Sequence, residues 1–185
     1  MAATLSDIRA RAAAIQALAL DVDGTLTDGH IYIGPQGEAM KAFSVRDGFG
    51  LTLLREAGLR LAIITARRSA IVEHRAAELG IATVIQGARD KLAALDSLCA
   101  EFGLARDQVG FAGDDWTDLP AMMAAGFAAA VADAEPAVRA RAHWVSTRPG
   151  GAGAIRDLAE FILDSRGALE AALARRIGPG PSRPA

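Results

Sequence analysis

A short apolar run, Ala17–Leu20, leads directly into two aspartates that lie two residues apart, Asp21 and Asp23. Such a run is typical of a strand buried on both faces of a sheet. Alternate side chains of an extended segment share a face, so both carboxylates project from the carboxyl end of this strand, where open α/β sheets place their ligands. Gly24 then allows a tight turn that brings backbone N–H groups close to an anion. The pattern predicts a site in which one acid acts as a nucleophile, the other handles protons, and both have access to a metal.

Two simpler interpretations explain this segment less well. An EF-hand calcium loop that begins at Asp21 would need an oxygen ligand, a glycine and a glutamate at its fifth, sixth and twelfth positions. The chain has Thr25, Leu26 and Tyr32 there, which excludes this kind of calcium site. A purely structural turn is the default for a lone Asp-Gly pair. It fits two aspartates at the end of an apolar strand poorly, because unpaired charges there cost free energy.

Strand patterns alternate with helical patterns along the chain, which predicts βαβ units and a parallel, doubly wound sheet. The expected strands are Ala17–Val22, Arg60–Ile64, Ala82–Ile85, Val109–Gly113 and Ala128–Val131, with a weaker one near Trp144. The expected helices are Gly48–Ala57, Ser69–Leu79, Asp90–Phe102, Leu119–Ala125 and Gly153–Asp164. Ile31–Ile33 and Glu38–Ser44 flank a Gly34–Gly37 turn and predict a β-hairpin. The expected fold class is therefore α/β, a three-layer Rossmann-like sheet with a β-hairpin flap.

Length and composition narrow the class of protein. The 185 residues suit one domain, which we place at residues 1–176, followed by a Gly- and Pro-rich segment at 177–185 that we expect to be disordered. The chain is 51% hydrophobic, yet no apolar stretch is long enough for a transmembrane helix, and the amino-terminal residues lack the apolar core of a signal peptide. A net charge of −2 without a basic run argues against a nucleic-acid partner. We expect a cytoplasmic protein with no membrane partner.

Three further strand ends carry polar residues. Thr65 ends the second strand with a hydroxyl and the exposed amides of a helix start, which suit phosphate oxygens. Lys91 begins the helix after the third strand, and the fourth strand is followed by three acids, Asp114, Asp115 and Asp118. Each feature alone has an ordinary explanation: a helix cap, a solvated lysine, or acids that complement a helix dipole. Their succession at consecutive strand ends is far more specific than any one of them.

The segment Asp21–Thr25, Thr65, Lys91 and the block Gly113–Asp118 resemble, in this order, the four motifs of the haloacid dehalogenase-like phosphatases. The resemblance implies that Asp21 attacks phosphorus and forms an aspartyl-phosphate. Asp23 would protonate the leaving alcohol and then deprotonate the water that hydrolyses this intermediate.

The same resemblance implies a Mg²⁺ ion, a hard cation that oxygen ligands suit. Its ligands would be the Asp21 carboxylate, the Asp23 main-chain carbonyl and Asp114. Lys91 and Thr65 would hold the transferring phosphoryl group. The remaining two acids, Asp115 and Asp118, would order Lys91 or metal-bound water.

The spacing of these motifs leaves no room for the cap domain that larger members of the superfamily insert. Between Asp23 and Thr65 the chain holds only the hairpin and one helix, and between Thr65 and Lys91 only one helix and one strand. An uncapped site is open to water, so a bulky substrate or neighbouring subunits must exclude it. We expect the hairpin to pack protomers around each site.

More detailed similarity indicates the 3-deoxy-D-manno-octulosonate 8-phosphate phosphatases. It lies in Asp28–Glu38, Lys41, Phe43, Val45–Gly48, Val131–Ala134 and Gly150–Arg156. Those enzymes are magnesium-dependent homotetramers of Gram-negative lipopolysaccharide biosynthesis, with a C-terminal segment that reaches into a neighbour's site. The resemblance therefore implies a small-molecule sugar phosphate as substrate and active sites at subunit interfaces.

The resemblance also implies a substrate pocket. Its residues would be Asp23, Ser44, Val45, Arg46, Asp47, Gly48, Arg67, Arg75 and Lys91. Arg67 and Arg75 are separated by about two turns of a presumed helix, so they are expected to share a face. A guanidinium fork suits the substrate carboxylate. For Arg75, a solvated helix residue is the alternative.

Three departures from the family pattern bear on the substrate. Ala66 stands where Gly is usual after the threonine, and Thr52 and Ala152 stand where basic residues are usual. Fewer positive charges near an anionic substrate leave open a phosphatase for another sugar phosphate, such as a nine-carbon 2-keto acid 9-phosphate. A non-catalytic assembly module is the alternative from a different class. Such a module has no need of its nucleophile, whereas Asp21 and its partner residues are all present.

Overall fold

The computed structural model describes residues 4–178 of the chain. Its centre is a six-stranded sheet in the order β5-β4-β1-β6-β7-β8, in which every neighbouring pair is parallel. The strands are β1 (Ala17–Leu20), β4 (Arg60–Thr65), β5 (Thr83–Gln86), β6 (Val109–Gly113), β7 (Phe127–Ala130) and β8 (Trp144–Val145). Every residue of β1, β6 and β7 is buried, as predicted for strands that are covered on both faces.

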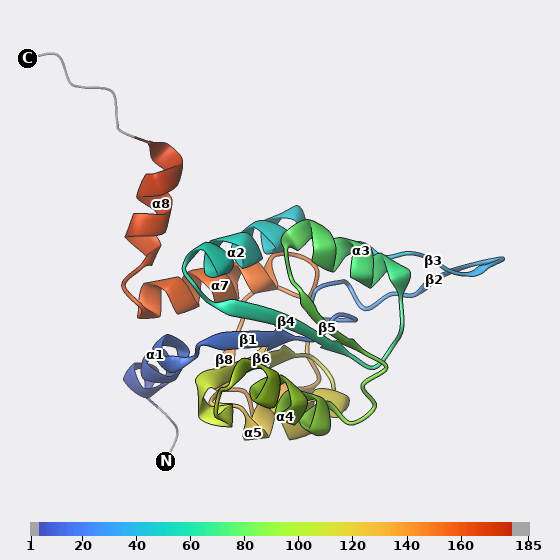
Figure 1. Cartoon of the computed structure of the whole chain (residues 1–185), viewed down its shortest axis with the longest axis horizontal. Helices are drawn as coiled ribbons and strands as arrows, with labels where there is room; N and C mark the ends of the chain where they lie inside the picture. The colour runs from blue at the N-terminus through green and yellow to red at the C-terminus, as the bar shows by residue number, and fades with distance from the viewer. Residues whose placement is uncertain (1–3, 179–185) are drawn as a thin grey trace, which may run out of the picture.

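Helices cover both faces of this sheet, which confirms the predicted three-layer α/β architecture (Figure 1). One face carries α1 (Leu5–Ala14), α2 (Val45–Glu56), α3 (Ala70–Leu79) and α7 (Ala154–Ser165). The other carries α4 (Lys91–Phe102), α5 (Leu119–Ala124) and the short α6 (Pro136–Arg139). Two apolar clusters result, and β1 contributes to both because its side chains alternate: Leu18 and Leu20 to one, Ala17 and Ala19 to the other.

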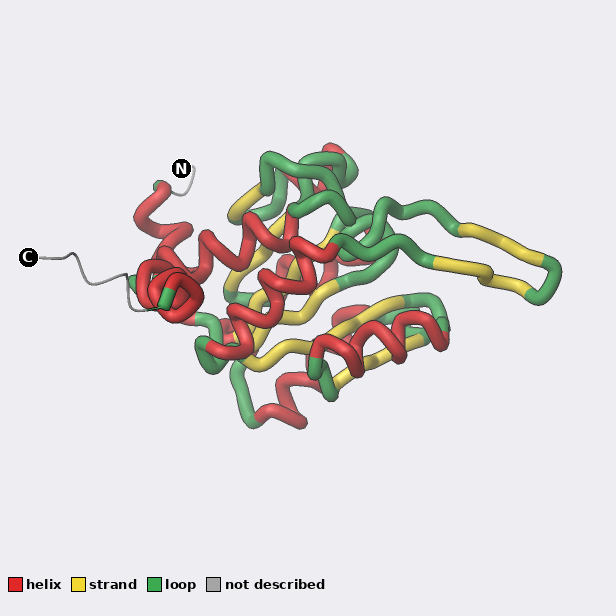
Figure 2. Tube along the Cα trace, turned by 90° about the horizontal axis from the view of Figure 1, so that it is seen from above, coloured by secondary structure: helices red, strands yellow, loops and turns green. Residues whose placement is uncertain are grey.

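The predicted hairpin is formed by β2 (Tyr32–Gly34) and β3 (Gly37–Met40) and extends well away from the body of the molecule (Figure 2). Its apolar side chains are exposed, with Ile33 at 78% and Met40 at 57%. The second strand was predicted to continue to Ser44, and this was wrong. Ser44 instead caps α2, since its hydroxyl accepts the N–H of Asp47 at 3.4 Å, so the helix begins at Val45 rather than at Gly48.

Other boundaries also differ from expectation. The first strand ends at Leu20, before the two aspartates, because Val22 accepts the turn hydrogen bonds that follow it. Helix α1 was not predicted, although Thr4 caps it in a capping box with Asp7. Two short 3₁₀ turns, η1 (Arg106–Gln108) and η2 (Trp116–Asp118), flank β6.

At the C-terminal end, α8 (Leu169–Ile177) follows α7 and contacts α2: Arg176 pairs with Glu56 at 2.6 Å, and Ala172 is buried (Figure 1). The segment 177–185 was predicted to be disordered; Ile177 belongs to α8, and 179–185 lie outside the described residues. Among residues 4–178, no helix combines the length and the apolar character that a bilayer crossing requires.

Candidate active site

The register of the three central strands brings the predicted site residues to one edge of the sheet. Leu20 at the end of β1 pairs with Ile63 of β4 and with Ala112 of β6. The N–H of Asp21 donates to the Ala112 carbonyl at 3.0 Å, which extends this alignment by one residue. The first aspartate of the chain's motif and the acids that follow β6 therefore lie side by side, as the sequence pattern predicts.

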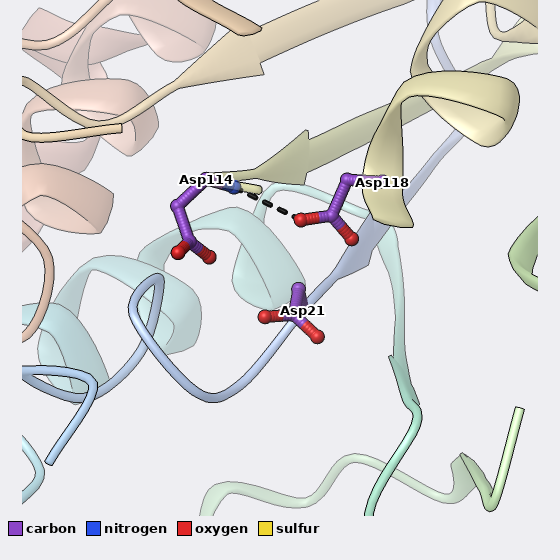
Figure 3. Close-up of side chains that lie close together, drawn as sticks. All are labelled: Asp21, Asp114 and Asp118. Atoms are coloured by element: carbon purple, nitrogen blue, oxygen red, sulfur yellow. Dashed lines mark hydrogen bonds between the residues drawn. The ribbon is translucent and has the colours of Figure 1, made fainter. Parts of the chain in front are cut away.

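Three carboxylates converge at this edge (Figure 3). One oxygen each of Asp21, Asp114 and Asp118 lie within 4.8 Å of one another. Asp21 and Asp118 are buried, and Asp114 is partly exposed. Like charges this close repel, so the cluster requires a compensating cation.

Lys91 supplies that cation from the first turn of α4. Its ammonium lies 2.6 Å from Asp21 Oδ1 and also donates to Asp118 Oδ1. Burial alone would lower the pKa of Lys91, but the two carboxylates outweigh burial, so the pKa is raised and the side chain stays charged. Burial raises the pKa of Asp21 well above its usual range; Asp118 adds to this shift and Lys91 opposes it.

Asp118 holds the neighbouring backbone as well as Lys91. Its Oδ2 accepts the N–H groups of Asp114 and Asp115, at 3.0 and 3.1 Å. This arrangement matches the expected ordering of Lys91, although Asp118 also stands within the carboxylate cluster itself. The carboxylate of Asp115 is turned elsewhere: it is exposed, accepts the N–H of Trp116 at 2.6 Å, and makes no contact with Lys91 in the described structure. Of the two roles expected for Asp115, this geometry does not support ordering of Lys91, and ordering of metal-bound water stays a prediction.

The turn after β1 packs closely against Asp114. Thr25, which is fully buried, donates its hydroxyl to Asp114 Oδ1 at 2.8 Å. Gly24 has φ +97°, and a Cβ there would lie 2.6 Å from the Asp114 carboxyl carbon, so only glycine leaves room for this carboxylate. Burial raises the pKa of Asp114 to about 6, partly offset by the Thr25 hydrogen bond.

Asp23 faces the base of the hairpin rather than the other three acids. The Lys41 ammonium donates to Asp23 Oδ1, and it lies 2.9 Å from Glu38 Oε1. Arg67 Nε lies 3.7 Å from Asp23 Oδ2. The hydroxyl of Ser69, at the start of α3, donates to Glu38 and so connects this network to the body of the protein.

Of the two arginines expected to share a helix face, only Arg67 lies beside the aspartates. Arg67 precedes α3, which begins at Ala70, so the prediction that both lie on one helix was wrong. Arg75 lies on α3, packs over the Phe43 ring at 5.8 Å and contacts Glu78 at 3.1 Å. It is neither fully solvated nor in contact with a site carboxylate.

The predicted pocket segment forms the first turn of α2, and its residues point in different directions. Ser44, Asp47 and Gly48 line a small cavity with Arg75. Val45 and Arg46 are exposed. Asp47 is buried, and its carboxylate accepts backbone N–H groups at the start of α7, from Gly153 at 3.2 Å and Arg156 at 2.8 Å. The structure therefore shows Asp47 capping a helix of another segment.

Thr65 ends β4 as predicted and is buried, while its carbonyl accepts the N–H of Ala88 at 3.0 Å. The three departures from the family pattern lie in different surroundings. Ala66 is exposed directly after Thr65, and Ala152 is exposed in a glycine loop whose Gly151 N–H donates to Thr25. The Thr52 hydroxyl donates to the Gly48 carbonyl inside α2 at 3.1 Å, so it is occupied within its own helix.

Comparison with known proteins agrees with this geometry. Residues 73–154 match the haloacid dehalogenase-like hydrolase family. The 3-deoxy-D-manno-octulosonate 8-phosphate phosphatase of Yersinia pestis is 45% identical over 166 residues, which cover 90% of this chain and 89% of the relative. The enzyme of the same name from Escherichia coli (strain K12) is 42% identical over 172 residues, covering 93% and 92%. The chain belongs to the family of these phosphatases.

A solved structure extends the agreement to the whole fold. The 3-deoxy-D-manno-octulosonate 8-phosphate phosphatase of Moraxella catarrhalis, crystallised with a magnesium ion, a phosphate ion and KDO, superposes with a TM-score of 0.91. It is 41% identical, and the match covers 94% of this chain and 99% of that one. The similarity therefore extends over nearly the whole chain, including the six-stranded parallel sheet.

The side chains present fit a bound Mg²⁺ ion. Three carboxylates offer hard oxygen ligands within one small space, and a single ammonium leaves the cluster with a net negative charge. Within residues 4–178, one oxygen of Asp21 and one of Asp114 accept no hydrogen bond, whereas both oxygens of Asp118 accept hydrogen bonds. This division favours the first two acids as ligands, with Asp118 as the residue that keeps Lys91 in place.

Sequence reasoning missed four residues of the site. Thr25 contacts Asp114 and Lys41 contacts Asp23, whereas Glu38 contacts Lys41 and Ser69 donates to Glu38. Glu38 and Lys41 stood within the segments that resemble the family, but nothing in their spacing indicated that Lys41 meets Asp23 or that Glu38 supports it. A charged pair three residues apart at the end of a hairpin is ordinarily a surface feature. Its burial against the turn after β1 follows only from the path of the chain.

Proposed function

We propose that this protein is a Mg²⁺-dependent phosphatase that hydrolyses 3-deoxy-D-manno-octulosonate 8-phosphate to 3-deoxy-D-manno-octulosonate and phosphate, in the cytoplasm, as a step of lipopolysaccharide biosynthesis. The observation that carries the proposal is the cluster of Asp21, Asp114 and Asp118 around Lys91. Identity of 45% to a curated enzyme of this activity over 90% of the chain supports the substrate.

In the first step, an Asp21 carboxylate oxygen attacks phosphorus. The new P–O bond replaces the bond to the sugar oxygen, and an aspartyl-phosphate forms. Asp21 must be ionised to attack, but burial raises its pKa. Lys91, whose ammonium lies 2.6 Å from Asp21 Oδ1, opposes this shift and favours the ionised form. Magnesium bound beside Asp21 and Asp114 would neutralise charge on the transferring phosphoryl group.

Asp23 handles the protons of both steps. In its protonated form it gives a proton to the departing sugar oxygen, and as the carboxylate it then takes one from the water that attacks the aspartyl-phosphate, which releases phosphate and restores Asp21. Its carboxylate lies between Lys41 and Arg67, on the side of the cluster that faces the hairpin. Thr65 and Lys91 hold phosphoryl oxygens, and Arg67 is free to pair with an anionic group of the sugar acid because its side chain is 44% exposed.

The proposed assembly is a homotetramer with sites at the subunit interfaces. Between Asp23 and Thr65 the chain forms the hairpin, α2 and β4, so the site is covered by no domain of its own among the described residues. The hairpin exposes Ile33 and Met40, which would be buried by a neighbouring subunit. Analytical ultracentrifugation tests this, and a monomer at micromolar concentration would contradict it.

The decisive experiment measures phosphate release from a panel of sugar phosphates with and without Mg²⁺. We expect the highest kcat/KM on 3-deoxy-D-manno-octulosonate 8-phosphate, complete dependence on the metal, and no turnover by Asp21→Asn. Preference for a nine-carbon 2-keto acid 9-phosphate would contradict the proposed substrate but not the proposed mechanism. Undiminished turnover by Asp21→Asn would refute the covalent mechanism, and an inactive parent protein would favour the assembly module.

A further inference from the structure

The buried side chain of Lys41, which directly follows the hairpin, contacts Asp23, the acid proposed to handle protons. Lys41 follows β3, donates to Asp23 Oδ1 and lies 2.9 Å from Glu38 Oε1. On the open side, Arg67 lies 3.7 Å from the second oxygen of Asp23 and 3.7 Å from the same Glu38 oxygen. The four charges alternate in sign around a ring, so each carboxylate lies between two cations.

The two cations of this ring differ in burial and therefore in freedom. The side chain of Lys41 is 1% exposed, whereas that of Arg67 is 44% exposed. A buried ammonium cannot turn away without leaving two carboxylates unpaired in a poorly solvated space. An exposed guanidinium at a longer distance turns away at little cost. Lys41 thus fixes Asp23, while Arg67 can leave it for a substrate.

Amino-acid usage gives an independent observation. Of the 20 lysines and arginines in the chain, only two are lysines, Lys41 and Lys91. Both side chains are buried, and each contacts one aspartate of the first motif and one further carboxylate. An ammonium is a compact charge with freely directed donors, whereas a guanidinium is planar and wide. A chain otherwise built with arginine therefore has lysine at the two places where a cation must fit between two carboxylates.

We propose that Lys41 is a positioning residue: it holds the Asp23 carboxyl group in the orientation from which Asp23, once it carries a proton, gives that proton to the leaving alcohol. This inference rests on the proposed function, because it needs Asp23 to handle that proton. Glu38 holds Lys41 from the other side and is itself held by the Ser69 hydroxyl. The orientation of Asp23 is therefore set by the hairpin and by Ser69 at the start of α3, as well as by the turn after β1 that carries Asp23.

The choice of leaving group separates proton transfer from the other steps. A sugar alcohol is a poor leaving group unless it is protonated, whereas p-nitrophenolate leaves without a proton. In this mechanism kcat/KM covers the steps up to formation of the aspartyl-phosphate, so it reports on the departure of the alcohol and not on later hydrolysis. Lys41→Met, Lys41→Arg and Asp23→Asn are compared with the parent enzyme on the sugar phosphate and on p-nitrophenyl phosphate, with saturating Mg²⁺.

For Lys41→Met we expect kcat/KM on the sugar phosphate to fall by about 10-fold or more, and on p-nitrophenyl phosphate by less than about 3-fold. Lys41→Arg keeps the charge, and with it the fold, but does not fit the same space. We therefore expect kcat/KM to fall more on the sugar phosphate than on p-nitrophenyl phosphate, but by less than in Lys41→Met. Equal losses on both substrates in the two variants would refute the positioning role. Arg106→Ala removes only an exposed ion pair with Asp96 and is the control that leaves both values unchanged.

Asp23→Asn distinguishes this inference from the proposed function. It should show the same contrast between the two substrates, more strongly than Lys41→Met. If Asp23→Asn shows the contrast and the Lys41 variants do not, Lys41 has no positioning role and the proposed mechanism stands. If Asp23→Asn loses both activities equally, the assignment of Asp23 in the proposed function is itself refuted.

Discussion

Replacement of Lys91 by methionine tests how strongly the acidic cluster depends on its one buried cation. The side chain of Lys91 is 3% exposed, and its partners Asp21 and Asp118 are 7% and 1% exposed. Methionine keeps the unbranched stem of the side chain and removes the charged end, so two buried carboxylates lose their partner. Loss of one member of a buried ion pair costs about 3–5 kcal/mol. In a chain of this size each kcal/mol corresponds to roughly 2–4 °C, so the melting temperature should fall by roughly 6–20 °C.

The assay is differential scanning calorimetry of the parent and of Lys91→Met in metal-free buffer near neutral pH, repeated with Mg²⁺. The cluster of the variant carries one more uncompensated negative charge, so we expect Mg²⁺ to raise its melting temperature more than that of the parent. Burial already raises the pKa of Asp21, and protonation of the acids would relieve their repulsion. The difference in melting temperature between variant and parent should therefore narrow as the pH is lowered.

A melting temperature within about 2 °C of the parent in metal-free buffer would refute the reasoning, because it would mean that the carboxylates need no cation. An equal Mg²⁺ shift in both proteins would refute the charge argument for metal binding. Arg106→Met is the matched control. It removes a guanidinium whose ion pair with Asp96 is 48% and 45% exposed, and it should change the free energy of unfolding by less than about 1 kcal/mol.

Three further outcomes follow from the packing. Gly150→Ala would place a Cβ 2.6 Å from the carbonyl carbon of Gly24, which is backbone and cannot yield, so activity and melting temperature should both fall; a fully active variant would contradict this. Asp47→Ala leaves two N–H groups at the start of α7 unpaired and should lower the free energy of unfolding, measured with urea, by about 1–3 kcal/mol. Asp47→Asn should lose less of this free energy because its amide oxygen can still accept a hydrogen bond. Burial lowers the pKa of His143, whose neutral ring accepts the N–H of Ala128 at 2.9 Å. This contribution to stability is complete above the ordinary pKa of 6.5 and is lost as the pH falls through the lower value in the folded protein, so replacement by asparagine should flatten that part of the stability profile.

Much of the fold could be predicted because the signals for it are local. Apolar runs such as Ala17–Leu20, separated by helical patterns, indicate a parallel sheet without knowledge of any contact. Parallel strands place their carboxyl ends at one edge, so polar residues after β1, β4 and β6 had to meet there. The start of α2 was misplaced because Ser44, the capping residue, also suits the end of a strand.

The partners of Asp23 could not be predicted in the same way. Lys41 reaches Asp23 only because the chain leaving the hairpin after β3 returns to the turn after β1, and nothing in the spacing of the two residues specifies that path. The spacing of Arg67 and Arg75 along the sequence suits one helix face. However, α3 begins after Arg67, so the two side chains lie in different surroundings.

By itself the sequence determined the sheet, the order of the motifs along it and the absence of room for a cap, because apolar periodicity and spacing along the chain act locally. Only the tertiary structure decided which charges neutralise one another: Lys91 with Asp21 and Asp118, and Lys41 with Asp23 and Glu38. Buried charges are stable only when oppositely charged groups from distant segments arrive together, and that depends on how the loops close over the sheet. The aspartate pair after β1 marks where the chemistry occurs, and the folded chain determines how each acid is held.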